Sequence, residues 1–171
     1  MQEKISLAGI VTDSITDGPG LRTVFFTQGC PHNCEGCHNP QTHPFDGGTL
    51  YSVQELKPLL TANPLLTGVT LSGGEPICQA KALLPLAKFV KEELKKELAI
   101  YSGYTFEQIL SMGKSELELL KTADVLVDGK FVKSLRTLDI KFRGSSNQRV
   151  IDVQQSLTQN NVILETSDRW N

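Results

Sequence analysis

The sequence predicts an α/β fold, an open partial (β/α) barrel with mostly parallel strands. Short apolar segments with strand character alternate with segments of helical periodicity, which is the pattern of βαβ units. About five such units are too few for a closed eight-fold barrel of roughly 250 residues, since the chain has 171. No internal repeat, low-complexity tract or linker interrupts it, so residues 1–171 are expected to form a single domain.

The first half of the chain predicts three strands, a loop and a helix. Strands are expected at 5–11, 21–27 and 69–71, and a loop rich in Gly, Pro, Asn and His at 28–49. Ser52 is expected to cap a helix that ends near Ala62, because Glu55 completes a capping box. Pro58 is expected to break or kink this helix, since proline cannot donate the backbone hydrogen bond.

The second half predicts two more helices and up to four strands. Leucine, alanine and valine recur at helical spacing over 79–96. Thr105, with Gln108 three residues later, is expected to cap another helix. Strands are expected at 98–101, 125–127, 150–153 and 162–164.

Composition and charge restrict the class of protein. The chain is 39% hydrophobic and 21% charged, with a net charge of −2, so nucleic acid and anionic membrane are not expected as partners. No apolar run approaches the roughly 18 residues of a membrane span, and the amino terminus has no secretory signal. We therefore expect a cytoplasmic protein whose four cysteines are reduced, which favours a metal site over disulfides.

Three of these cysteines, Cys30, Cys34 and Cys37, form a C-x3-C-x2-C motif. Three thiolates without a fourth can hold a [4Fe–4S] cluster that keeps one iron open for a substrate, whereas four-cysteine clusters usually only transfer electrons. The alternative is a structural zinc site completed by His32, His38 or His43. Structural zinc sites usually collect ligands from two knuckles, and the sequence has no second cysteine pair. Cys78 stands alone and is expected to be a small buried thiol.

A second motif, Ser72-Gly73-Gly74-Glu75, follows a predicted strand. It is either a tight turn or a place where glycines let the backbone approach a ligand and Glu75 accepts a cationic group such as an α-ammonium. The cysteine loop and the segments ending at Glu75, Gly103 and Gly129 all follow strands. Since the carboxyl ends of parallel strands meet at one rim, these segments are expected to lie together there.

Together, these motifs resemble those of the radical S-adenosylmethionine enzymes. The segment from Asp17 to Phe25, DGPGLRTVF, is similar to the signature of glycyl-radical-enzyme activases. The segments YSGYT, from Tyr101, and FRGSSNQR, from Phe142, resemble those of activases that act on anaerobic ribonucleoside-triphosphate reductases. The resemblance covers about residues 5–167 and implies a partial barrel of the radical S-adenosylmethionine type.

This resemblance implies that the chain generates a glycyl radical on the reductase through reductive cleavage of S-adenosyl-L-methionine at one [4Fe–4S] cluster. It implies Cys30, Cys34 and Cys37 as cluster ligands. The expected cofactor-binding residues are Gly36, Cys37, His38, Ser72, Gly73, Gly74, Glu75 and Asp128. The expected partner-binding residues are Asp17, Arg22, Asn147 and Arg149. No residue is expected to act as a general acid or base, since the cofactors supply the chemistry.

The implied partners are the large subunit of the reductase and flavodoxin or a similar electron donor. Three other functions remain open at this point. The chain is alternatively an activase of another glycyl radical enzyme such as pyruvate formate-lyase, a small radical enzyme acting on a free metabolite, or a non-catalytic zinc-binding interaction module. The sequence also departs from many radical enzymes in having Gly36, where an aromatic residue commonly precedes the third cysteine, so adenine packing is expected from elsewhere, for example from His38.

Overall fold

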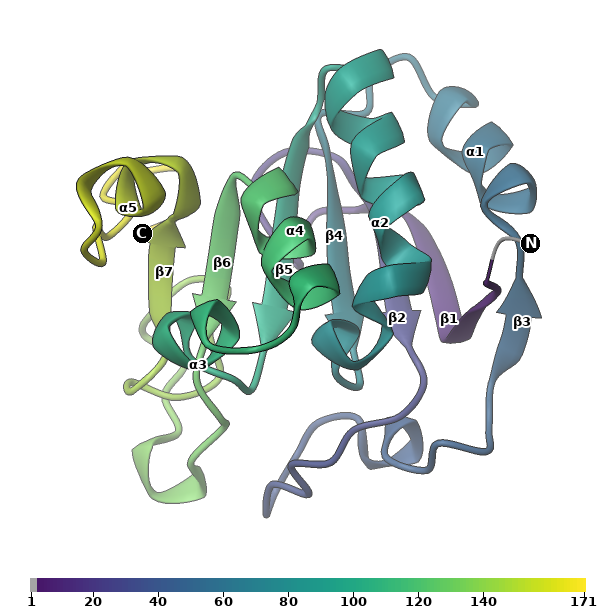
Figure 1. The fold of residues 1–171 in the computed structure, drawn as a ribbon. Coiled ribbons are helices and arrows are strands. Elements are labelled where there is room, and N and C mark those ends of the chain that lie inside the picture. The colour runs from purple at the N-terminus through teal and green to yellow at the C-terminus, as the bar shows by residue number, and fades with distance from the viewer. Residues whose placement is uncertain (1–2) are drawn as a thin grey trace.

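The computed structural model describes residues 3–171 as one seven-stranded sheet with helices packed against it (Figure 1). In spatial order the strands run β3-β1-β2-β4-β5-β6-β7. Strands β2, β4, β5 and β6 are parallel, whereas β1 is antiparallel to β2 and β3, and β7 is antiparallel to β6. Their bounds are β1 (Ile5–Ser14), β2 (Arg22–Thr27), β3 (Thr49–Tyr51), β4 (Gly68–Gly73), β5 (Glu97–Ser102), β6 (Val125–Asp128) and β7 (Arg149–Asp152). The predicted α/β class and mostly parallel sheet are confirmed.

The five α-helices of residues 3–171 are α1 (Val53–Thr61), α2 (Ala80–Lys88), α3 (Phe106–Leu110), α4 (Lys114–Thr122) and α5 (Val153–Gln159). Both predicted capping boxes are present, at Ser52 with Glu55 and at Thr105 with Gln108. Within these residues, no helix combines the length and the apolar composition needed to cross a bilayer.

Several boundaries differ from the sequence predictions. Helix α1 continues through Pro58, where a break was expected, because Leu56 and Leu60 on either side of it are buried in the core. The helix expected over 79–96 consists of a 3-10 turn (Pro76–Gln79), α2, and a π-helical turn (Phe89–Glu93). The elements β3, α4 and α5 were not predicted, since only one helix was expected after Thr105. The strand expected at 162–164 is a single bridge between Leu164 and Ile151.

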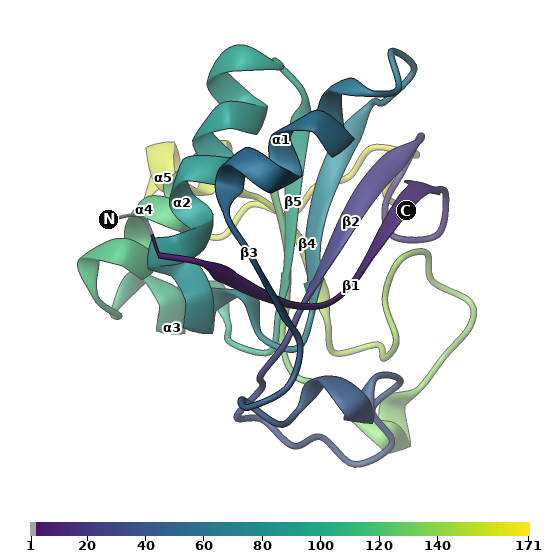
Figure 2. The same cartoon turned by 90° about the vertical axis from the view of Figure 1, so that its right-hand side faces the viewer.

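The two faces of the sheet carry cores of different size, because successive side chains of a strand point to opposite faces. On β5, Leu98 and Ile100 face the helices and join the main core, while Ala99 faces a smaller cluster on the other side. Trp170, which is fully buried, and Phe142 cover that smaller cluster. Figure 2 shows the helices on one side and loops from the second half of the chain on the other.

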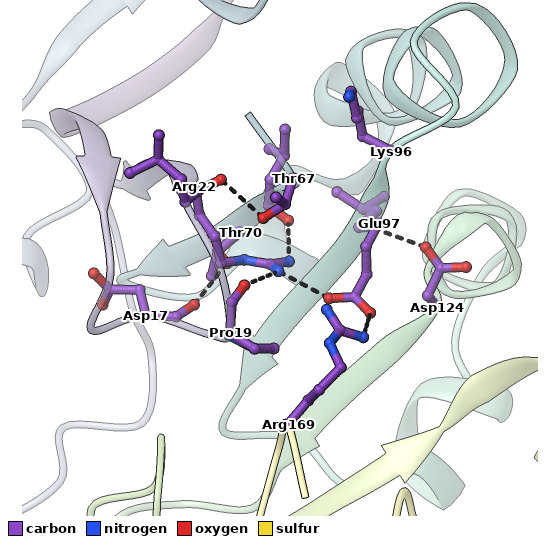
Figure 3. A network of polar contacts seen from close by, with 12 residues as sticks. Asp17, Pro19, Arg22, Thr67, Thr70, Lys96, Glu97, Asp124 and Arg169 are labelled. Carbon is purple, nitrogen blue, oxygen red and sulfur yellow. Dashed lines mark hydrogen bonds and ion pairs between the residues drawn. The ribbon is translucent and has the colours of Figure 1, made fainter. Parts of the chain in front are cut away.

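At the amino ends of the parallel strands, Arg22 is fully buried in a polar network (Figure 3). Its guanidinium donates to the carboxylate of Glu97 at 2.8 Å, the hydroxyl of Thr70 at 2.9 Å and the carbonyl of Pro19 at 3.0 Å. It also packs over the ring of Trp170. Burial lowers the pKa of Arg22, and the ion pair with Glu97 opposes this effect. The segment before β2 is therefore held to the sheet by one buried cation.

We expect Glu97→Gln to lower the free energy of unfolding by about 2–3 kcal/mol, because it leaves the buried guanidinium of Arg22 without a counter-charge. Urea unfolding measures this loss. The control is Arg169→Gln, which removes the exposed partner of the same carboxylate and should cost less than about 1 kcal/mol. Equal losses in the two variants would contradict a special contribution from the buried pair.

Candidate functional site

The carboxyl ends of β2, β4, β5 and β6 all open onto one cavity of about 230 Å³. The loop after β2 contributes Cys30, Cys34 and Cys37, and the end of β4 contributes Ser72, Gly73 and Gly74. Segments after β5 and β6 complete the wall with Ser102, Gly103, Gly129, Lys130 and Phe131. The structure thus brings together, at one rim, the four segments that the sequence analysis singled out.

The cysteine loop is fixed at its base by backbone hydrogen bonds. The amide of Gly29 donates to the carbonyl of Thr42 at 2.7 Å, and that of Cys30 donates to His43 at 3.0 Å. All three cysteines of the motif are partly exposed. Burial raises the pKa of the Cys30 thiol, and the nearby Glu75 raises it further. Among residues 3–171, no three His, Cys, Asp or Glu side chains converge closely enough for a single metal ion. Three thiols spread around one cavity suit the donor set of a [4Fe–4S] cluster.

The glycines after β4 serve a close approach between chain segments. A β-carbon on Gly74 would overlap the carbonyl of Gly29, and one on Gly73, whose φ is +97°, would overlap the backbone of Thr27. The amide of Gly74 donates to Thr27, and that of Glu75 donates to Gly29, both at 2.8 Å. The sequence analysis expected these glycines to let the backbone approach a ligand. In the structure, the absence of a β-carbon at both positions lets the backbone of β2 and of the cysteine loop come close.

Glu75 differs from its expected role. Its side chain is fully buried, and both carboxylate oxygens are occupied by donors from His32, Ile77, Ser102 and Gly103. In this arrangement the carboxylate lies behind the cavity wall instead of lining it, so it does not present a free acceptor to a bound ammonium.

Asp128, Asn147 and Arg149 lie around a second cavity, of about 600 Å³, which adjoins the first at Gly103, Gly129 and Lys130. The carboxylate of Asp128 is buried and accepts the Arg149 guanidinium at 3.0 and 2.6 Å and the amide of Phe106 at 2.8 Å. The hydrogen bonds of Arg149 to Asp128 and to Glu107 raise the pKa of its guanidinium. Asp128 and Arg149 are therefore paired with each other, and Asn147 donates to the carbonyl of Lys130.

Two of the predicted partner-binding residues lie away from the rim. Arg22 is fully buried at the opposite end of the sheet, so its side chain presents no surface for the partner contact predicted for it. Its burial follows from the ion pair with Glu97 and the hydrogen bond to Thr70. Asp17 is partly exposed and accepts hydrogen bonds from the hydroxyls of Ser14 and Thr16.

The fourth cysteine, Cys78, is exposed and lies outside the cavity lining, whereas a buried thiol was expected.

Known proteins similar to this chain include a family that binds a [4Fe–4S] cluster, in agreement with the three cysteines that line the cavity. Residues 16–151 match a family model described as a 4Fe-4S single cluster domain. Anaerobic ribonucleoside-triphosphate reductase-activating protein from phage T4 is 37% identical over 78% of this chain and 85% of its own length. The proteins of that name from Vibrio cholerae and Escherichia coli K12 are 37% and 32% identical, over 89% and 91% of their lengths and 78% and 80% of this chain. The chain belongs to this family of activating proteins.

The fold of this family member also resembles that of QueE from Escherichia coli. The TM-score is 0.51 at 14% identity, covering 73% of this chain and 71% of the other. At this level of identity, the likeness concerns the fold alone.

Two residues that line the cavity, Phe131 and Gln148, were not among the functional residues predicted from the sequence of this activating protein. Phe131, in the loop after β6, packs edge-on against His38 with ring centroids 5.5 Å apart, and a β-carbon on Gly36 would touch it at 3.4 Å. Gln148 lines the same cavity and accepts the amide of Gly144. Phe131 lies in no motif, so only its tertiary contact reveals it, whereas Gln148 lies within the FRGSSNQR segment, where it was given no role.

For this activating protein, Gly74→Ala should destabilise the fold by roughly 1–3 kcal/mol, because the added methyl group must displace the backbone of the cysteine loop. Chemical unfolding of the metal-free chain measures the loss. Gly9→Ala is the matched control, since a β-carbon at Gly9 meets nothing within 4 Å. If Gly74→Ala had the same free energy of unfolding as Gly9→Ala and lost only cofactor affinity, Gly74 would instead serve to let the backbone approach the ligand.

Proposed function

We propose that this protein is a radical S-adenosylmethionine oxidoreductase with a partial-barrel fold that activates an anaerobic ribonucleoside-triphosphate reductase by generating a glycyl radical on it. The observation that carries the proposal is the meeting of three cysteines with the Ser72–Gly74 turn at the carboxyl rim of the parallel strands. The names of its relatives support the choice of reductase as the partner.

In this proposal, Cys30, Cys34 and Cys37 hold one [4Fe–4S] cluster and leave one iron without a protein ligand. The cluster and S-adenosyl-L-methionine, when bound, supply a radical that removes a hydrogen atom from a glycine of the reductase. The main chain of Ser72, Gly73 and Gly74 borders the methionyl group. The rings of His38 and Phe131, which pack edge-on and line the cavity, provide a surface for the adenine in place of the aromatic residue missing at Gly36.

The alternatives are less favoured. A zinc-binding module does not agree with a family described by a single 4Fe-4S cluster. An activase of pyruvate formate-lyase would share this site and differ only in its partner, but the relatives carry the name of the ribonucleotide reductase activator. A small radical enzyme acting on a free metabolite is less favoured, because the relatives carry the name of a protein that activates another protein.

The test is to reconstitute Cys34→Ala anaerobically with iron and sulfide and to measure iron, the visible spectrum and the glycyl radical formed on the reductase by electron paramagnetic resonance. We expect loss of the cluster and of the radical, with the fold largely kept. Cys78→Ala is the matched control, since this cysteine lies outside the cavity lining, and it should behave like the natural protein. S-adenosylmethionine cleavage by Cys34→Ala, or a glycyl radical appearing only on pyruvate formate-lyase, would refute the proposal.

We also propose that flavodoxin or a similar acidic electron donor docks on the basic loop, residues 130–149. This loop has six basic residues and one acidic residue, whereas the whole chain has a net charge of −2. It lies beside the cysteine loop (Figure 2), with Lys133 paired to Glu35 at 3.4 Å. Leu138, which is 89% exposed, lies among these charges. Complementary charge speeds the encounter of proteins that exchange electrons.

Reversing two charges with Arg136→Glu and Lys141→Glu should slow reduction of the cluster by flavodoxin roughly tenfold at low salt, and the difference should shrink as salt screens the loop. Reduction by dithionite should not change, since a small reductant needs no docking surface. The control reverses Lys88 and Lys114, which are exposed on helices. An unchanged flavodoxin rate together with weaker binding of the reductase would assign the basic loop to the reductase instead.

A further inference from the structure

We infer that Glu75 is a positioning residue that holds the cysteine loop through His32, and that its carboxylate is not the acceptor for a bound ammonium. We call this pair the Glu75–His32 clamp. The inference rests on the proposed function for the identity of the cluster, although the clamp itself joins only residues of this chain. His32 stands between Cys30 and Cys34, so fixing its ring fixes the part of the loop that carries two of the three thiols.

The carboxylate of Glu75 has no bonding capacity left for a ligand. Oε1 accepts the amide of Ile77 at 3.0 Å and the hydroxyl of Ser102 at 2.8 Å. Oε2 accepts the amide of Gly103 at 2.8 Å and Nε2 of His32 at 2.6 Å. An ionised carboxylate offers about four lone-pair positions, and four protein donors occupy them. With no exposed surface, Glu75 could bind an ammonium only by losing one of these donors.

His32 is held equally firmly from its other side. Its side chain is only 5% exposed, and its ring packs edge-on against the ring of Tyr104, with the ring centroids 4.5 Å apart. A β-carbon on Gly103 would collide with the imidazole, so the ring occupies the space that this glycine leaves. The clamp therefore explains the segment Ser102-Gly103-Tyr104. Ser102 and Gly103 donate to the carboxylate, Gly103 makes room for the ring, and Tyr104 packs against it.

Three strand ends converge on this one carboxylate. The loop after β2 reaches it through His32, the end of β4 supplies Glu75 itself, and the end of β5 supplies Ser102 and Gly103. At the same point, the amide of Glu75 donates to the carbonyl of Gly29, immediately before Cys30. The clamp thus fixes the cysteine loop at His32, between Cys30 and Cys34, while the bonds of Gly29 and Cys30 to Thr42 and His43 fix its base. A hydrogen bond to a buried charge contributes more than one between neutral groups, so its loss should loosen the loop.

The experiment compares Glu75→Gln and His32→Ala with the natural chain in two states. In the metal-free state, hydrogen exchange followed by mass spectrometry should show residues 29–43 exchanging roughly tenfold faster in both variants, with α4 unchanged. In the reconstituted state, the cluster of both variants should be lost to a chelator several-fold faster. In Glu75→Gln, the S-adenosylmethionine affinity of the fraction that retains its cluster, titrated by the change in its paramagnetic spectrum, should stay within about twofold. His32→Ala is not used for this readout, because His32 itself lines the cavity. His43→Ala is the control, a histidine of the same loop without contact to Glu75.

A double variant separates the clamp from two independent effects. Because both substitutions break the same link, Glu75→Gln combined with His32→Ala should lose its cluster little faster than His32→Ala alone. Additive losses would overturn the clamp. Normal exchange and normal cluster retention in Glu75→Gln, together with a large loss of S-adenosylmethionine affinity, would also overturn it and make the carboxylate a ligand. Failure of the natural chain to form a cluster would refute the proposed function, while the exchange result in the metal-free chain would still decide the clamp.

Discussion

The parallel register between β2 and β4 is the constraint on which the rest of the structure depends. It pairs Arg22 with Gly68 at one end and Thr27 with Gly73 at the other. Beyond that end, the amide of Gly74 donates to Thr27 and the amide of Glu75 donates to Gly29, which extends the contact into the cysteine loop. Neither Gly73 nor Gly74 tolerates a β-carbon, because the backbone of β2 and of the cysteine loop lies against both glycines. This close approach sets where the cysteine loop leaves the sheet, and hence where a cluster would lie relative to the ends of β4 and β5.

Each end of this strand pair contains a buried charge that serves a different purpose. Arg22 joins the amino ends of β2 and β5 through Glu97 and supports the Trp170 ring, so its effect is on stability. Glu75 joins the carboxyl ends and reaches into the cysteine loop, so its effect is on the site. Breaking the Arg22–Glu97 pair is costly, although a buried ion pair is seldom a net source of stability when compared with apolar packing. Both buried groups impose geometry, since each links strands that are distant in sequence.

The sequence was sufficient for much of the fold and for the location of the site, because those depend on local signals. Hydrophobic patterning located the parallel strands, the capping boxes at Ser52 and Thr105 located two helix starts, and the position of motifs after strands predicted a common rim. The contacts that the sequence could not predict are tertiary. The burial of Arg22 requires Glu97, some 75 residues away, and the engagement of Glu75 requires donors from two other segments. Phe131 has no motif and is found only through its contact with His38.

An irregular loop that binds a cluster must be ordered before or during binding, and ordering costs conformational entropy. This chain meets that cost largely within the protein. The base of the loop is joined by backbone hydrogen bonds, the amide of Glu75 holds Gly29, and the clamp holds His32. The three cysteines line the cavity, and the Sγ of Cys37 also accepts the amide of Asn39 within the loop. If the carboxylate is committed to the loop as proposed, ligand recognition at the turn after β4 would fall to the main chain of Ser72, Gly73 and Gly74. Main-chain groups are fixed by the sheet and lose no side-chain entropy on binding, so they suit a cofactor that must be held in one orientation.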